Sequence, residues 1–132
     1  MVAHNLENKE GMKTRLISEV KKEEKIFDVG PLTCKHILER MKSCHSLLWN
    51  GPLGVFEMPP FDKGTTTVAQ GAARLTRDKS LLSVAGGGDT VAALVHAGVL
   101  EDFTYVSTAG GAFLEWLEGK PLPGVIALQK KD

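Results

Sequence analysis

The chain lacks the features that mark a disulfide-bonded, membrane-spanning or secreted protein. Its 132 residues include only two cysteines, too few for a disulfide scaffold. No apolar run approaches the roughly 20 residues that a bilayer-spanning helix needs, so we expect no membrane attachment. The first ten residues show no basic segment followed by an apolar stretch, so no signal peptide is expected. A cytoplasmic protein is the resulting expectation.

An excess of charge of one sign is also missing. Sixteen basic residues balance sixteen acidic ones, and the formal net charge is zero. Because sequence-independent nucleic-acid binding depends on a basic excess, we expect no nucleic-acid partner. The hydrophobic fraction of 42% suffices for the core of one domain, or of part of a larger one.

The two cysteines lie in a segment with helical periodicity. Its apolar side chains would share one face of a helix, and they are Cys34, Ile37, Leu38, Met41 and Cys44. On such a stripe a free cysteine behaves as a small apolar residue. The sequence has no Cys-x-x-Cys motif and no Cys/His cluster, so it favours packing over a metal or redox role for both thiols.

From about Ile26 onward, short apolar runs alternate with helical patterns. The runs, interpreted as buried strands, are 26–29, 47–49, 81–85, 105–106 and 125–128. The helical patterns start near Thr33 and cover 65–77, 89–96 and 112–118, with threonines expected to cap the second of these. Repeated strand–helix units predict an α/β fold, a three-layer αβα, Rossmann-like parallel sheet.

Residues 1–25 give a weaker signal. Residues 9–25 are rich in helix formers and charge, but residues 14–20 equally suit a strand, and Gly11 weakens a long helix. Local composition leaves both conformations open.

A first glycine-rich turn, Ala-Gly-Gly-Gly-Asp-Thr at residues 85–90, joins a predicted strand to a predicted helix. Glycines let backbone N–H groups approach an anion, and the first helical turn leaves its N–H groups unpaired, so we predict a phosphate site. Asp89 would hold Mg²⁺ against the phosphates. The alternative is an ordinary tight turn with Asp89 as the N-cap. The predicted phosphate-contacting residues are Gly86, Gly87, Gly88 and Thr90.

A second turn of this kind, at residues 107–112, contains Gly110 and Gly111 and also precedes a predicted helix. Ligands bind beyond the carboxyl ends of strands in open parallel sheets, so both turns can face one crevice. A polyanion would then lie between them. Two ordinary strand-to-helix turns are the alternative.

A third loop, Trp-Asn-Gly-Pro-Leu-Gly-Val-Phe-Glu, begins at Trp49 directly after a predicted strand. Its composition indicates a rigid irregular loop. Asn50 can donate to a phosphate oxygen, Glu57 can accept from ribose hydroxyls, and Pro52 can contribute to an apolar bed for a sugar or base. Alternatively, the loop is structural and places Trp49 and Phe56 in the core.

Five motifs in register make the chain similar to the phosphoglycerate kinase family. Residues 28–33 are similar to D-I-G-P-x-T, 49–57 to W-N-G-P-M-G-V-F-E, 61–65 to F-x-x-G-T, 86–90 to G-G-G-D-[ST], and 107–124 to the family's last block. Four residues depart from the family's pattern, and none of them removes a proposed donor or metal ligand. They are Leu53 for Met, Ala109 for the first of three glycines, Tyr105 for a common His, and Phe113 for a common Ser.

The resemblance implies a function. The family transfers a phosphoryl group between 1,3-bisphosphoglycerate and MgADP in glycolysis, giving 3-phosphoglycerate and MgATP. By similarity, Asp89 would hold the nucleotide's Mg²⁺, Asn50 would approach the phosphates, and Glu57 the ribose. The turn at 87–90 would cradle the phosphates of ATP or ADP. Gly110 and Gly111 would be catalytic, cradling the phosphoryl group in flight.

The resemblance also implies that much of the enzyme is absent. Residues 26–132 would be the C-terminal part of the nucleotide-binding domain. Residues 1–25 would be a β-hairpin in the incomplete start of that domain, with 4–6 and 15–20 extended. Because domain closure assembles the active site in this family, we expect no catalysis by this chain alone.

Two alternatives concern what the chain does by itself. In the first, it is a stand-alone module that binds Mg-nucleotide or phosphate without catalysis. In the second, it is a structural piece whose exposed strand edge leads it to self-associate. The full-length enzyme is expected to be a monomer.

Overall fold

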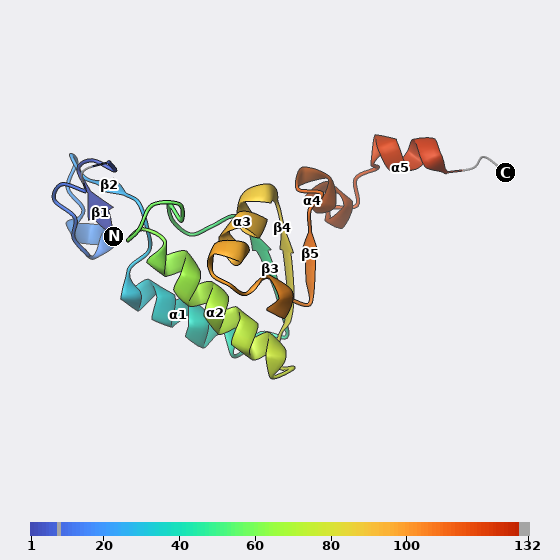
Figure 1. Ribbon diagram of the computed structural model, residues 1–132, viewed down its shortest axis with the longest axis horizontal. Helices are drawn as coiled ribbons and strands as arrows, with labels where there is room; N and C mark the ends of the chain where they lie inside the picture. The colour runs from blue at the N-terminus through green and yellow to red at the C-terminus, as the bar shows by residue number, and fades with distance from the viewer. Residues whose placement is uncertain (8, 130–132) are drawn as a thin grey trace.

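The structure, a computed structural model, describes residues 1–7 and 9–129. A small parallel sheet with its helices lies between an N-terminal segment and two C-terminal helices that extend away from it (Figure 1). The strands are β1 (Val2–Ala3), β2 (Lys25–Ile26), β3 (Ser46–Asn50), β4 (Leu82–Gly86) and β5 (Tyr105–Ser107). The α-helices are α1 (Pro31–Met41), α2 (Lys63–Arg77), α3 (Gly88–His96), α4 (Gly111–Leu117) and α5 (Pro123–Leu128). The 3-10 helices are η1 (Ile17–Glu19) and η2 (Leu100–Asp102). None of the helices within 1–7 and 9–129 has the length and apolar character needed to cross a membrane.

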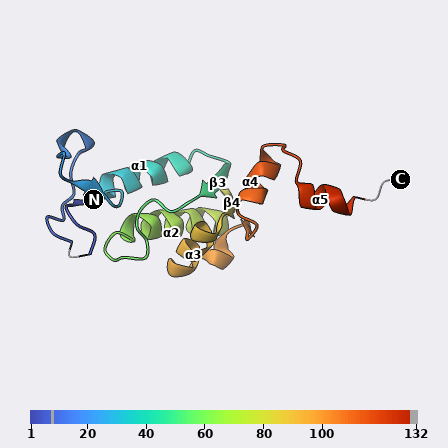
Figure 2. The same ribbon diagram turned by 90° about the horizontal axis from the view of Figure 1, so that it is seen from above.

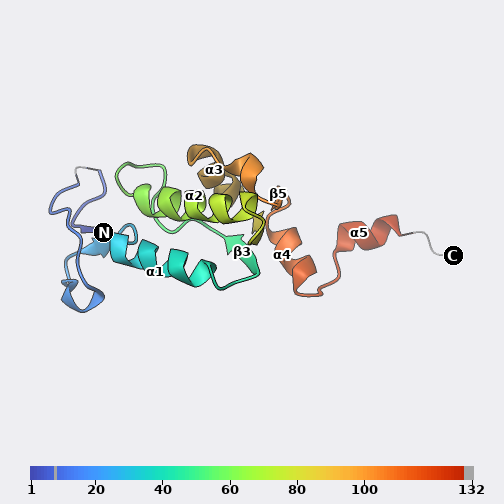
Figure 3. The ribbon, with the colours of Figure 1, turned by 90° about the horizontal axis from the view of Figure 1, so that it is seen from below.

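The sheet has the order β3–β4–β5, and both strand pairs are parallel. Figures 2 and 3 show α2 between α1 and α3 on one side of the sheet. This arrangement confirms the predicted α/β class with a parallel sheet flanked by helices. The strand predictions at 47–49, 81–85 and 105–106 are confirmed by β3, β4 and β5.

The core lies between the sheet and α2. The face of α2 toward the sheet carries Val68, Ala69, Ala72 and Ala73, each at most 1% exposed. Alanines at these positions let the helix approach the strands closely, where Trp49 is also buried.

The predicted apolar stripe of α1 belongs to the same core. Cys34 and Met41 are buried, and Ile37, Leu38 and Cys44 pack against the cluster. Both thiols are free. Burial raises the pKa of the Cys34 thiol, which keeps it protonated and fits the predicted packing role.

The other face of the sheet is only partly covered. Phe113 of α4 lies against it, with its ring 5.7 Å from that of Tyr105. Leu48, Leu82 and Tyr105 remain 52%, 51% and 54% exposed. Neither α4 nor α5 has a buried residue, so these helices add little to the core.

Three local predictions are wrong. Residues 125–128 form part of α5 and not a strand, because a helix satisfies its own backbone whereas a strand needs a neighbour. The run 26–29 contributes only β2, which pairs antiparallel with β1 and does not join the parallel sheet. The N-cap of α2 is Asp62, without a side-chain capping bond, so the threonines do not cap this helix.

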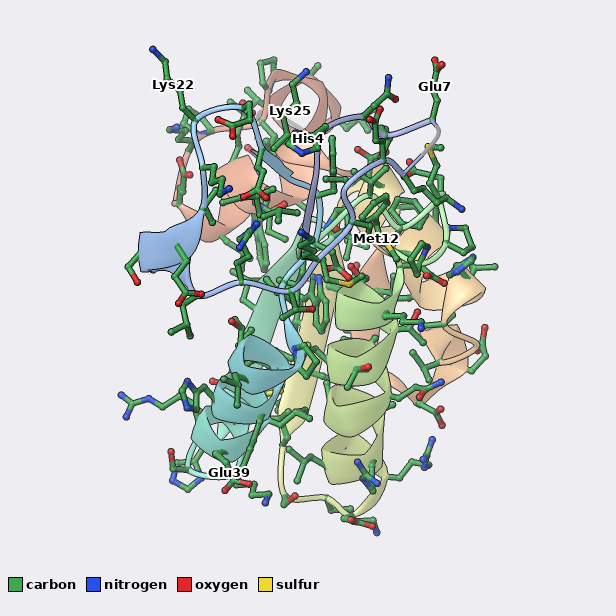
Figure 4. All side chains as sticks on the ribbon, turned by 90° about the vertical axis from the view of Figure 1, so that its left-hand side faces the viewer. His4, Glu7, Met12, Lys22, Lys25 and Glu39 are labelled. Carbon is green, nitrogen blue, oxygen red and sulfur yellow. The ribbon has the colours of Figure 1, made fainter. Side chains whose placement is uncertain are left out.

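The N-terminal segment is held by backbone pairing. Val2 exchanges hydrogen bonds of 2.8 and 2.9 Å with Lys13, and the N–H of His4 donates to Glu10. Neither a helix over 9–25 nor an extended 15–20 appears, because η1 occupies Ile17–Glu19. The division of the chain at residue 25 stays a prediction. Figure 4 shows this segment over the N-terminal ends of α1 and α2, which lie side by side.

Candidate phosphate site at the carboxyl end of the sheet

The three strands of the parallel sheet end at the same level. Asn50, the last residue of β3, pairs with Gly86, the last of β4, and Gly86 pairs with Ser107, the last of β5. The loops that follow all three strands therefore leave from one edge, which is where ligands bind in open parallel sheets.

The two glycine turns and the loop after β3 meet at this edge. A Cβ built on Gly110 would lie 3.9 Å from the Cα of Gly87. A Cβ built on Gly87 would lie 3.9 Å from Oδ1 of Asn50. The structure thus brings Asn50, Gly87 and Gly110 together from three separate loops.

The backbone of both turns suits an anion. Gly87 and Gly110 are the N-caps of α3 and α4 and have positive φ values of 103° and 51°. In the part of the chain that the structure describes, no atom lies within 4 Å of a Cβ built on Gly88 or Gly111, so both of these next residues face open space. First-turn N–H groups lack intrahelical partners, and the helix dipole adds positive potential there. The arrangement can hold phosphate oxygens through backbone donors.

Thr90 positions the loop after β3. Its side chain is 1% exposed, and its Oγ1 accepts a 2.7 Å hydrogen bond from the N–H of Gly51. From the other side, Nε1 of Trp49 donates to the carbonyl of Gly51 at 2.6 Å. The hydroxyl oxygen of Thr90 therefore orders the peptide next to Asn50.

Asp89 lies in the first turn of α3 and is exposed. Because Gly87 is the N-cap and no side chain caps this helix, the alternative that Asp89 is the N-cap is wrong. No group of three or more potential metal ligands exists among residues 1–7 and 9–129. One carboxylate fits Mg²⁺ that arrives with a nucleotide, because this ion takes one or two carboxylates plus phosphate oxygens and water.

Glu57 and Pro52 are placed differently. Pro52 directly follows Gly51 and is half-buried. Glu57 is exposed, and its buried neighbour Phe56 has its ring 6.2 Å from that of His96, the last residue of α3. Because α3 begins at the glycine turn, Glu57 lies toward the far end of this helix, about 13 Å long at 1.5 Å per residue. The structure does not bring Glu57 into the cluster of glycine turns.

The sequence model of the phosphoglycerate kinase family matches residues 1–120. The chain belongs to this family. It is 64% identical over 113 residues to the phosphoglycerate kinase of Sphingopyxis alaskensis, covering 86% of this chain and 28% of the relative. With that of Caulobacter sp. strain K31 the identity is 56% over 129 residues, covering 98% and 33%.

Solved structures agree. The phosphoglycerate kinase of Coxiella burnetii superposes with a TM-score of 0.85 at 43% identity, over 97% of this chain and 32% of that one. For the enzyme of Pyrococcus horikoshii the TM-score is 0.68 at 36% identity, over 80% and 25%. The chain thus spans about a third or less of the length of these phosphoglycerate kinases.

One residue of this chain has a role that the motif alone did not reveal. Asp28, within the Asp-x-Gly-Pro motif, is 2% exposed. Its Oδ2 accepts from the N–H of Gly64 at 2.7 Å, and its Oδ1 accepts from the N–H of Val29 at 2.8 Å. Gly64 lies in the first turn of α2, so the carboxylate of Asp28 binds the positive end of that helix.

Two glycines make room for Asp28. A Cβ on Gly54 or on Gly64 would overlap its carboxylate. Asp28 therefore joins the segment before α1, the loop after β3 and the start of α2. Neither Gly54 nor Gly64 has a positive φ, so both are needed for the space they leave, and the two glycines were the sequence signal for this packing.

Burial raises the pKa of Asp28, and the N–H groups of Gly64 and Val29 oppose this shift. A carboxyl whose pKa is higher in the folded than in the unfolded state binds more protons when folded. Its stabilising contribution is complete below the ordinary pKa of 3.8 and is lost as pH rises through the folded-state pKa.

We therefore expect the stability difference between wild type and Asp28→Asn to be larger near pH 3 to 4 than at about pH 7. Urea unfolding of both proteins across this range measures the difference, and subtracting the variant removes the titration of all other groups. A difference that grows toward neutral pH would mean that the two N–H donors outweigh burial.

Proposed function

We propose that this chain forms the nucleotide half-site of a phosphoglycerate kinase, which transfers a phosphoryl group between 1,3-bisphosphoglycerate and ADP to give 3-phosphoglycerate and ATP. The convergence of Asn50, Gly87 and Gly110 at one edge of the sheet carries the proposal. Because glycolysis takes place in the cytoplasm, we place the enzyme there, as a monomer that binds neither nucleic acid nor membranes.

The groups at this edge suit phosphoryl transfer, which depends on positioning and charge neutralisation more than on covalent help. The N–H groups of residues 86–90 would cradle the nucleotide phosphates, and the amide of Asn50 would donate to the same chain. Gly110 and Gly111 would present N–H groups to the phosphoryl group in transit. When bound, Mg²⁺ supplies positive charge to the phosphate oxygens, and Asp89 is the carboxylate that would hold it.

Glu57 and Pro52 would serve the nucleoside. The carboxylate of Glu57 would accept from the ribose hydroxyls, and the ring of Pro52 would give the sugar or base an apolar contact. Both positions lie on the loop that begins with Asn50, so a nucleotide whose phosphates rest on the glycine turns would extend along this loop.

The chain by itself is expected to show no turnover. Phosphoryl transfer also needs a site for the phosphoglycerate, and this chain corresponds to 28% and 33% of two full-length relatives. A coupled assay with the isolated chain measures this directly, and nucleotide-dependent turnover that disappears in Asp89→Asn would contradict it.

Binding of MgADP tests the half-site. The sequence contains two tryptophans, so Trp116→Phe leaves Trp49, bonded to Gly51, as the only tryptophan reporter of the loop. We expect a saturable fluorescence change with MgADP, and a dissociation constant raised about tenfold by Asp89→Asn, as for loss of one charged contact. Asp78→Asn, the same change at the far end of α2, is the control.

Absence of a saturable change up to millimolar MgADP would contradict the half-site. So would equal affinities of the Asp89→Asn and Asp78→Asn variants, because the charge at α3 would then have no specific role.

A nucleotide-binding module without catalysis is the second candidate. It is favoured by the observation that all three loops of the site lie within this one chain. The intact mass of the native gene product distinguishes the kinase from the stand-alone binding module. A product much heavier than 14.3 kDa supports the kinase, and one of 14.3 kDa supports the module.

A further inference from the structure

A groove between α1 and α2 opens to solvent outside the core. Its volume is about 600 Å³, within the range of small-molecule sites. Figure 4 shows the two helices side by side along its length. No lining residue belongs to the loops after β3, β4 or β5, so the groove is distinct from the nucleotide site.

The floor of the groove is apolar. Val29, Leu38 and Leu75 are partly buried there and pack against the core. Leu38 lies directly on the backbone of α2 at Gly71, where any Cβ would overlap its side chain. The floor is therefore formed by close helix packing, and an apolar ligand would displace water from it without opening the core.

The rim of the groove is basic. Within residues 1–7 and 9–129, four cationic side chains line it and one acidic one, Glu39, whose Oε1 accepts from Nζ of Lys42 at 2.9 Å. The hydrogen bond from Lys42 lowers the pKa of Glu39, and the charge of Lys35 adds to this shift. Four cations against one carboxylate leave an excess of positive charge. Because the whole chain has a net charge of zero, this excess is a property of the groove. The cationic residues are Lys35, Lys42, Lys63 and Arg74.

We infer that the groove binds a small amphipathic anion, a molecule with an apolar body and one carboxylate, sulfonate or phosphate group. The apolar floor would bury the body of the ligand, and the rim cations would pair with its head group. Lys and Arg side chains suit this task because their stems cover apolar surface while their charges stay in water.

Decanoate, a simple aliphatic carboxylate, is the probe for the test, with decyltrimethylammonium as a cationic ligand of the same chain length. Calorimetric titration of the full chain is expected to give saturable binding of decanoate about tenfold tighter than of the cation. In heteronuclear NMR spectra the amides of α1 and α2 are expected to shift. The amides of 86–90 and 107–112 are expected to stay unchanged.

Charge reversal at the rim is the decisive variant. Lys35→Glu with Arg74→Glu changes two exposed residues and is expected to weaken decanoate binding about tenfold. Lys22→Glu with Lys25→Glu changes the net charge equally at two exposed positions of the N-terminal segment and is expected to leave it unchanged (Figure 4). Thr67→Phe, also exposed on α2, would fill the groove and block binding while the rim charges remain.

Three results would overturn the inference. They are equal weakening by the two double variants, equal affinity for decanoate and for the cation, or the lack of saturable binding to a chain that unfolds cooperatively. None of them depends on nucleotide binding, so the inference and the proposed function are tested separately.

Discussion

Replacing Asp28 with alanine is expected to lower the free energy of unfolding by about 3 kcal/mol, since it leaves one buried and one partly buried N–H group without an acceptor. These donors belong to Gly64 and Val29, and both currently bind the carboxylate within 2.8 Å. The start of α2 also loses the negative charge at its positive end. Urea unfolding at neutral pH measures the loss, and Asp78→Ala, at the exposed end of α2, is the control.

A double-mutant cycle isolates the packing of Asp28 against Gly64. Gly64→Ala is expected to cost about 1 to 3 kcal/mol, because its Cβ would overlap the carboxylate. In the Asp28→Ala background the overlap with the carboxylate is gone and that with Val29 remains, so the cost of Gly64→Ala should fall by about 1 kcal/mol or more without vanishing. Strict additivity of the two losses would contradict the direct contact.

The four turn glycines are expected to form two groups when each is replaced by alanine, one that loses stability and one that gains it. Gly87→Ala and Gly110→Ala should each lower stability by about 1 to 2 kcal/mol, because an alanine is strained at their positive φ values. Gly88→Ala and Gly111→Ala should raise stability by a few tenths of a kcal/mol, because the added methyl group meets no atom and alanine favours a helix. Thermal unfolding measures both.

The changes in MgADP affinity of these four variants should not parallel their changes in stability. A methyl group on Gly87 or Gly110 would point at a neighbouring loop of the site, and one on Gly88 or Gly111 would stand in open space in the first turn of α3 or α4. Because the phosphates are proposed to approach these same turns, we expect all four variants to weaken MgADP binding about tenfold or more. Gly88→Ala and Gly111→Ala are the informative pair, because they would be more stable than wild type and yet bind worse. Unchanged MgADP affinity in both would contradict phosphate binding at these turns. Gly124→Ala, on α5, is the matched control at open space.

Several features of the site could be predicted from local patterns. Apolar runs at 47–49, 81–85 and 105–106 became β3, β4 and β5, because buried strands of a parallel sheet are short and apolar on both faces. The glycines of the two turns were recognisable because a positive φ at the N-cap of α3 or α4 is tolerated by few other residues. That these turns would share one edge followed from the rule for parallel strands.

Other features depended on contacts that local patterns do not carry. Val125 and Ile126 have high strand propensity, but α5 forms where no strand lies beside them in the part of the chain described. In the sequence Glu57 lies on the same loop as Asn50. In the structure its neighbour Phe56 packs on His96, the last residue of α3, so Glu57 lies toward the far end of that helix.

By itself the sequence determined the α/β class, the order of the three loops and the family, because each depends on residue type and spacing along the chain. The tertiary structure decided which groups act together. Thr90 reaches Gly51 from 39 residues away, and Asp28 reaches Gly64 from 36 residues away. The geometry of such hydrogen bonds is set by how distant segments pack together and not by the segment in which each residue lies.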